Sequence, residues 1–144
     1  MSKPYGLRML PELYREWALT GMVANIGSRL VEVKEGSMVM EGTMTIQAHG
    51  FPTGRGWIVH GGAIATLADE ALATVAYTLA DEGEATATVD LKVDYYKPCK
   101  PGRLIARATV GHRTRRLAFC RASVEQEDGE VVAEARAVIA YTRA

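Results

Sequence analysis

Residues 60–79 read HGGAIATLADEALATVAYTL and contain the longest regular pattern in the chain. From Ile64 onward the apolar side chains recur every three or four residues, which is the spacing of one face of an α-helix. This face consists of Ile64, Leu67, Ala68, Ala71, Leu72, Val75 and Leu79. The pattern therefore predicts an amphipathic helix of about five turns.

The chain after this helix alternates between apolar and polar side chains, as half-buried strands do. Residues 87–96 form the first alternating run, with Ala87, Val89, Leu91, Val93 and Tyr95 expected on one face. Three more strands are predicted within residues 104–110, 116–125 and 131–141, with a tight turn at Asp128-Gly129. Since short turns join consecutive strands in antiparallel order, these four strands predict an antiparallel sheet.

The chain before the long helix predicts smaller elements. Residues 10–26 are typical of a short amphipathic helix with Pro11 in its first turn, and strands are expected at residues 29–33 and 38–46. Residues 49–62 are rich in glycine and are expected to be a loop without regular structure. The whole pattern predicts one α+β domain, residues 1–144, with a curved antiparallel sheet around the long helix and residues 1–27 packed on it.

The composition excludes several classes of protein. Of 144 residues, 17 are Lys or Arg and 17 are Asp or Glu, so the formal net charge of zero argues against a nucleic-acid partner. No apolar run is long enough for a signal peptide or a membrane span, and we expect a cytoplasmic protein. The isolated Cys99 and Cys120 predict reduced thiols and no metal site, with Cys99 at a surface or an edge.

The long helix carries the residues that suggest chemistry. Gly61 and Gly62 follow His60 at its start, where unpaired amides and the helix dipole suit a phosphate or a developing oxyanion, although such glycines are often only a tight turn. Asp69 lies on a flank with Ala65, Ala73 and Ala76, a surface that a second backbone can approach closely. Glu70 lies on the opposite flank, among two threonines and a tyrosine, where we expect a solvated side chain.

The spacing of these residues suggests a second subunit. Asp69 is eight residues after Gly61, which corresponds to a rise of about 12 Å on a straight helix. One substrate carbonyl therefore cannot easily contact both groups of the same chain. Two antiparallel helices with their alanine flanks together would bring Gly61 of one chain near Asp69 of the other, which predicts a two-fold homodimer.

Residues 60–71 (HGGAIATLADEA) resemble the signature of the hotdog-fold acyl-CoA thioesterases, in particular the phenylacetic-acid-degradation (PaaI-like) branch. Residues 88–98 (TVDLKVDYYKP) with the following Pro101-Gly102 match the family's next strand and turn, and residues 128–133 match its closing hairpin. The likeness covers about residues 28–142.

The resemblance implies a function and a set of residues. Asp69 matches the catalytic acid, either nucleophile or general base, Gly61 matches the glycine whose amide polarises the thioester carbonyl, and Thr88 matches a hydroxyl that orients water. It also implies an acyl-CoA substrate, no cofactor beyond the coenzyme A of that substrate, and a site between subunits of a dimer or a dimer of dimers. His60 and Gly62 belong to the same helix start, with His60 expected to bond to the preceding loop.

Two features leave alternatives open. Many family members carry Asn or Gln six residues before the His, where this chain has Gly54, so Thr53 or Arg55 substitutes or the site is altered. A non-catalytic acyl-CoA or small-ligand binding protein is therefore the alternative.

Arg113, Arg115 and Arg116 either form a solvated rim or bind the phosphates of coenzyme A. The chain contains no G-x-S-x-G motif, which argues against a serine hydrolase. It also contains no Asp-x-x-x-x-His pattern, which argues against a hydratase of the same fold.

Overall fold

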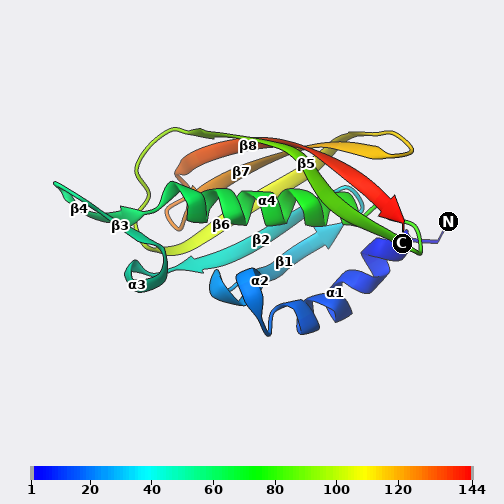
Figure 1. Ribbon diagram of the computed structural model, residues 1–144, viewed down its shortest axis with the longest axis horizontal. Coiled ribbons are helices and arrows are strands. Elements are labelled where there is room, and N and C mark those ends of the chain that lie inside the picture. Colours follow the sequence, from blue (N-terminus) through cyan, green and yellow to red (C-terminus); the bar gives the residue numbers. More distant parts are fainter. Residues whose placement is uncertain (1, 144) are drawn as a thin grey trace.

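The computed structural model describes residues 2–143 and confirms the predicted α+β fold, with one long helix on a curved antiparallel sheet (Figure 1). The helices are α1 (Tyr5–Trp17), α2 (Gly21–Asn25), α3 (Ile46–His49) and α4 (Gly61–Tyr77). The strands are β1 (Arg29–Lys34), β2 (Ser37–Met44), β3 (Gly50–Thr53), β4 (Gly56–Val59), β5 (Glu84–Tyr95), β6 (Gly102–Arg113), β7 (Leu117–Gln126) and β8 (Val131–Arg143).

The main sheet has six strands in the order β1-β2-β6-β7-β8-β5, and every pair of neighbours is antiparallel. β5 therefore forms one edge although it directly follows α4 in the chain. The predicted turn at Asp128-Gly129 is confirmed, since Gly129 has a φ of 87° and the Asp128 carboxylate accepts a hydrogen bond from the Glu130 amide at 2.8 Å.

The core lies between α4 and the sheet. The predicted apolar face of α4 is fully buried at Leu67, Leu72 and Val75, and it packs on the inward side chains of all the longer strands. Gly42 of β2 allows α4 to approach the sheet closely, because a Cβ at this position would lie 3.2 Å from the Leu67 side chain of α4. Alanines on β6, β7 and β8 continue this surface, so small side chains let the sheet wrap closely around the helix.

The N-terminal prediction is corrected. In place of one helix over residues 10–26, α1 begins at Tyr5 and α2 is a separate short helix. Pro11 lies inside α1, not in its first turn. Gly21, with a φ of 69°, turns the chain between the two helices, and this left-handed conformation suits glycine.

The segment expected to be a loop also contains regular structure. The strand predicted over residues 38–46 ends at Met44, because Thr45 caps α3 by accepting a hydrogen bond from the Ala48 amide at 3.1 Å. β3 and β4 then pair as a two-stranded hairpin. Figure 1 shows this hairpin projecting from the end of the molecule at which α4 begins. Among residues 2–143, no helix is long and apolar enough to cross a membrane.

The predicted alternation of β5 is interrupted by a bulge. Thr88 pairs with Ile139 and Asp90 with Val138, so Val89 is an extra residue in the ladder. Val89 is 63% exposed, and the residues before it point to the opposite face from the one that simple alternation predicts. The bulge places Thr88 on the same side of the sheet as α4.

Candidate active site

Asp69 and Thr88 are brought together by α4 and β5. The Thr88 hydroxyl donates a hydrogen bond to Asp69 Oδ1 at 2.7 Å, and the Asp69 carboxylate remains half-exposed. The second carboxylate oxygen is therefore available to a water molecule or a substrate. The geometry fits an acid whose orientation is held by a neighbouring hydroxyl.

The first turn of α4 leaves one amide available. The Gly62 amide donates to Nδ1 of His60 at 2.8 Å, so the imidazole caps the helix. The Ala63 and Ile64 amides both donate to the His60 carbonyl oxygen. Among residues 2–143, Gly61 is the one residue of this turn whose amide has no hydrogen-bond partner. An unpaired amide at a helix start can donate to an anion or to a polarised carbonyl oxygen.

His60 also anchors the helix to the preceding segment, as expected. Its backbone amide donates to the His49 carbonyl oxygen at 2.7 Å. The buried His49 side chain in turn accepts from the Thr45 amide at 3.0 Å and contacts Asn25 Oδ1 at 2.9 Å. These contacts fix the position at which α4 begins, and the exposed His60 ring caps its first turn through the Gly62 amide.

Tyr95 is a site residue that the sequence reasoning missed. Its hydroxyl donates to the Gly61 carbonyl oxygen at 2.7 Å, and its ring would lie 3.3 Å from a Cβ at position 61. Partial burial raises the pKa of Tyr95, so the hydroxyl stays protonated and remains a donor. The alternation of residues 87–96 indicates a strand, but it carries no signal for a contact with the helix start.

Glu70 is not the solvated side chain that we expected. Ser28 donates to Glu70 Oε1 at 2.8 Å, and the Tyr14 hydroxyl donates to Oε2. Burial raises the pKa of Glu70, and burial together with the Glu70 charge raises the pKa of Tyr14. Glu70 thus fastens α1 and the start of β1 to one flank of α4, and Asp69 lies on the other flank.

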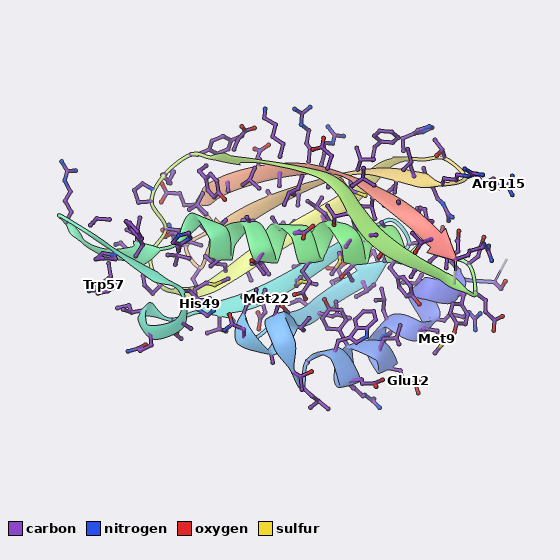
Figure 2. All side chains as sticks on the ribbon, in the orientation of Figure 1. Met9, Glu12, Met22, His49, Trp57 and Arg115 are labelled. Carbon is purple, nitrogen blue, oxygen red and sulfur yellow. The ribbon has the colours of Figure 1, made fainter. Side chains whose placement is uncertain are left out.

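The three candidate arginines lie near the far end of α4 from Gly61. Figure 2 shows Arg115 at the opposite end of the molecule from Trp57 and His49. Arg113 is held internally, because it forms an ion pair with Glu84 at 3.0 Å and stacks on the Tyr141 ring at 3.8 Å. Arg115 and Arg116 are exposed beside it.

Gly54 lies at the tip of the β3–β4 hairpin, where no atom would come within 4 Å of an added Cβ. The Thr53 hydroxyl is engaged in the hairpin turn, since it donates to the Gly56 carbonyl oxygen at 2.6 Å. Within one chain the structure therefore does not bring Thr53, Gly54 or Arg55 to Asp69.

Metal and thiol chemistry receive no support from the described residues. Within residues 2–143 no group of three His, Cys, Asp or Glu side chains could hold a metal ion. Cys99 is 1% exposed, which corrects its expected place at a surface or an edge. Burial raises the pKa of Cys99 to about 11 and that of Cys120 to about 12, so both thiols stay protonated near neutral pH.

Comparison with known proteins gives a family match and a shared fold. A model of the thioesterase superfamily matches residues 57–133. The PaaI protein from the phenylacetic acid degradation operon of Escherichia coli is 21% identical, with a TM-score of 0.80 over 98% of this chain and 96% of that chain. No curated protein sequence gave a significant match.

Two further solved structures share the fold. A putative thioesterase from Ralstonia eutropha, described as phenylacetic acid degradation-related, is 24% identical, with a TM-score of 0.78 over 90% of this chain and 97% of that chain. A thioesterase from Haemophilus influenzae is 17% identical, with a TM-score of 0.81 over 92% of this chain and 90% of that chain. At these identities the likeness concerns the fold.

Proposed function

This chain belongs to the thioesterase superfamily and is a thioester hydrolase with the hotdog fold, and from this we propose that it hydrolyses acyl-CoA thioesters at a site shared by two copies of the chain. One observation carries the proposal. The Gly61 amide has no hydrogen-bond partner among the described residues, and the Asp69 carboxylate is oriented by Thr88 with its second oxygen available. Eight residues of helix, about 12 Å, separate these two groups within one chain.

The chemistry follows from the two groups. The Gly61 amide and the positive end of the α4 dipole stabilise negative charge on the thioester carbonyl oxygen. Asp69 either takes a proton from an attacking water molecule or attacks the carbonyl carbon itself, and Thr88 orients the attacking group. Water supplies the new C–O bond, the C–S bond breaks, the coenzyme A sulfur takes a proton, and the free acid leaves.

The sheet edge supports a second copy. β5 pairs with β8 on one side, and among residues 2–143 no strand pairs with its other side. If the β5 strands of two copies paired antiparallel about a two-fold axis, the two sheets would become continuous and the two α4 helices would run antiparallel. Ala65 and Ala73 are half-exposed and can face the partner helix, whereas Ala76 is buried and cannot, which corrects its expected place on that flank.

The substrate's coenzyme A is expected to contact Arg115 and Arg116. The neighbouring Arg113 donates to the Leu79 carbonyl oxygen just after the end of α4, so this turn lies farther from Gly61 of its own chain than Asp69 does. Guanidinium groups match phosphate oxygens well, and neither side chain forms an ion pair within residues 2–143. His60 and Gly62 shape the helix start, next to the carbonyl.

A non-catalytic acyl-CoA binding protein is the alternative, and Gly54 is the observation that favours it. At the position where an amide side chain often assists the reaction, this chain presents no side chain. The alternative keeps the same site and the same ligand but predicts no turnover.

A thioester panel with free-thiol detection tests the proposal. We expect turnover of acyl-CoA substrates, with a lower KM for each acyl-CoA than for the matching acyl-pantetheine, since only coenzyme A carries the phosphates. Binding of acyl-CoA without release of thiol would support the alternative. Hydrolysis of acyl-pantetheine and acyl-CoA thioesters with equal KM would contradict the proposed contact of Arg115 and Arg116 with the coenzyme A phosphates.

Substitution of Tyr95 by phenylalanine should lower kcat about tenfold and change KM little. The ring would still pack on Gly61, but the hydrogen bond to the Gly61 carbonyl oxygen would be lost, so the first residue of α4 would be held less firmly. Steady-state kinetics on one acyl-CoA measures both constants. Tyr96→Phe is the matched control, because Tyr96 is a similarly exposed neighbour directly after the end of β5. An equal loss in both variants would contradict the positioning role.

A further inference from the structure

A hollow of about 590 Å³ lies between the β3–β4 hairpin and the segment that joins β5 to β6. Its volume is within the range of small-molecule binding sites. The lining includes Arg55, Trp57 and Ile58 from the hairpin, and Pro98 and Lys100 from the joining segment. Figure 2 shows Trp57 at this end of the molecule, on the hairpin that projects beyond the start of α4. We call this feature the hairpin hollow.

The two walls of the hairpin hollow are fixed to each other. The Val59 amide at the end of β4 donates to the Cys99 carbonyl oxygen at 2.8 Å. The Lys100 amide donates to Gln126 Oε1 at 2.8 Å, which holds the joining segment to the end of β7. The hollow is therefore formed before a ligand arrives, and a ligand need not order its walls on binding.

The charged side chains of the hairpin hollow are both positive. Arg55 and Lys100 are exposed, and among residues 2–143 neither side chain forms an ion pair. Lys97, three residues earlier, is by contrast paired with Glu130. Among the described residues no Asp or Glu lines the hollow, although the whole chain has a formal net charge of zero. Two unpaired cations with no acid in the lining favour an anionic ligand.

Trp57 gives the hairpin hollow an aromatic surface. Its side chain is 51% exposed. The ring packs closely on Gly50 of β3, because a Cβ at Gly50 would lie 3.0 Å from Trp57 Cε3. Nucleobases stack on exposed aromatic rings of this kind, and phosphates pair with Arg and Lys. The hollow therefore combines the two kinds of contact that a nucleotide requires.

The hairpin hollow also lies within reach of the helix start. Trp57 is four residues before Gly61, and an extended chain of that length spans at most about 14 Å. Arg115 lies at the opposite end of the molecule from Trp57 (Figure 2). Because the two α4 helices of the proposed dimer run antiparallel, the hairpin of one copy lies at the same end of the dimer as the partner subunit's Arg115 and the partner subunit's Arg116.

We propose that the hairpin hollow binds the nucleotide of coenzyme A, with the adenine stacked on Trp57 and phosphate oxygens paired with Arg55 and Lys100. This inference rests on the proposed function, because it takes an acyl-CoA as the ligand. Coenzyme A carries a diphosphate and a 3′-phosphate, so its phosphates face Arg55 and Lys100 on one side and the arginines of the partner subunit on the other. The pantetheine arm then leads from the nucleotide to the thioester carbonyl at Gly61.

Tryptophan fluorescence tests the site without turnover. Trp17 and Trp57 are the two tryptophans of the chain, so the Trp17→Phe variant leaves Trp57 as the reporter. The probe is adenosine 3′,5′-bisphosphate, which carries the adenine and two phosphates of coenzyme A but no thioester. We expect saturable quenching in Trp17→Phe and no quenching in the matched Trp57→Phe variant, where Trp17 on α1 is the reporter.

Removal of single charges tests the phosphate contacts. In the Trp17→Phe chain, Arg55→Gln and Lys100→Gln should each raise the Kd of the nucleotide about tenfold. Lys97→Gln is the matched control, because it removes the same charge from the same segment outside the lining of the hollow. We expect its Kd to stay within about twofold of the parent chain, since more distant exposed charges are screened. Equal effects of all three substitutions would overturn the assigned contacts.

Steady-state kinetics connects the hairpin hollow to the substrate. Trp57→Ala should raise KM for an acyl-CoA about tenfold and leave KM for the matching acyl-pantetheine unchanged. Failure of the nucleotide to quench Trp57 would overturn the proposal, as would quenching by acyl-pantetheine alone, since the hollow would then hold another part of the substrate. Quenching by the nucleotide in a chain that hydrolyses no thioester would support the nucleotide site and contradict the proposed hydrolysis, so the two failures are distinguishable.

Discussion

Replacement of Asp69 by asparagine should lower kcat for an acyl-CoA thioester by about 10³-fold. Asparagine keeps the size of the side chain and its oxygen can still accept the Thr88 hydrogen bond, so the helix and its contact with β5 should persist. What is lost is the carboxylate that removes a proton from water or attacks the carbonyl. Steady-state release of coenzyme A measures the loss, and circular dichroism with sedimentation confirms that the variant is folded.

Asp90→Asn is the control for this substitution. Asp90 is an exposed aspartate on the same strand as Thr88, it lies outside the proposed site, and the change removes the same charge. We expect the kcat of Asp90→Asn to remain within about twofold of wild type. Near-wild-type turnover by Asp69→Asn would contradict the assignment of Asp69 as the catalytic acid.

Substitution of Gly6 by alanine should lower the free energy of unfolding by about 2–3 kcal/mol, by undocking α1 from α4. The Gly6 amide donates to the Ala80 carbonyl oxygen at 2.9 Å, and a Cβ at Gly6 would lie 1.8 Å from the Tyr77 carbonyl oxygen. Backbone must therefore move, and the contact of Tyr14 with Glu70 would weaken with it. Urea denaturation measures the change.

Gly54→Ala is the matched control for Gly6→Ala, because its new methyl group would have no atom within 4 Å. We expect its free energy of unfolding to lie within about 0.5 kcal/mol of wild type. Equal stability of the Gly6→Ala variant and wild type would show that the close approach of α1 to α4 is not maintained in solution.

The elements that the sequence predicted well are those whose pattern reflects one buried face. α4 begins within one residue of the expected position, because its apolar spacing is continuous and its start is marked by His60 and two glycines. The β3–β4 hairpin was missed for the opposite reason. It lies outside the main sheet with Phe51 and Trp57 about half-exposed, so burial imposes no alternating pattern on its sequence.

The site could be predicted only as far as local spacing reaches. Gly61, Asp69 and Thr88 were identified as candidates, and the structure brings Asp69 and Thr88 into contact. The environment of Glu70 depends on Tyr14 and Ser28, which are 56 and 42 residues away in the chain, so no local pattern reveals it. The bulge at Val89 and the Tyr95 contact likewise depend on how β5 crosses α4.

Complementation between two inactive variants tests the shared site most directly. Asp69→Asn removes the acid and keeps Gly61, whereas Gly61→Val keeps the acid and crowds the amide, since even a Cβ at Gly61 lies 3.3 Å from the Tyr95 ring. The two variants are purified separately, shown to be folded dimers, then mixed in equal amounts and allowed to exchange subunits. In each mixed dimer, one site combines an intact Gly61 with the partner's intact Asp69.

The measurement is the specific acyl-CoA hydrolysis rate of the mixture. Random exchange makes half of the dimers mixed, each with one intact site of two, so we predict recovery of about a quarter of the wild-type rate. A mixture that exchanges subunits and stays as inactive as its two components would contradict the account, because it would place Gly61 and Asp69 of one chain in the same site.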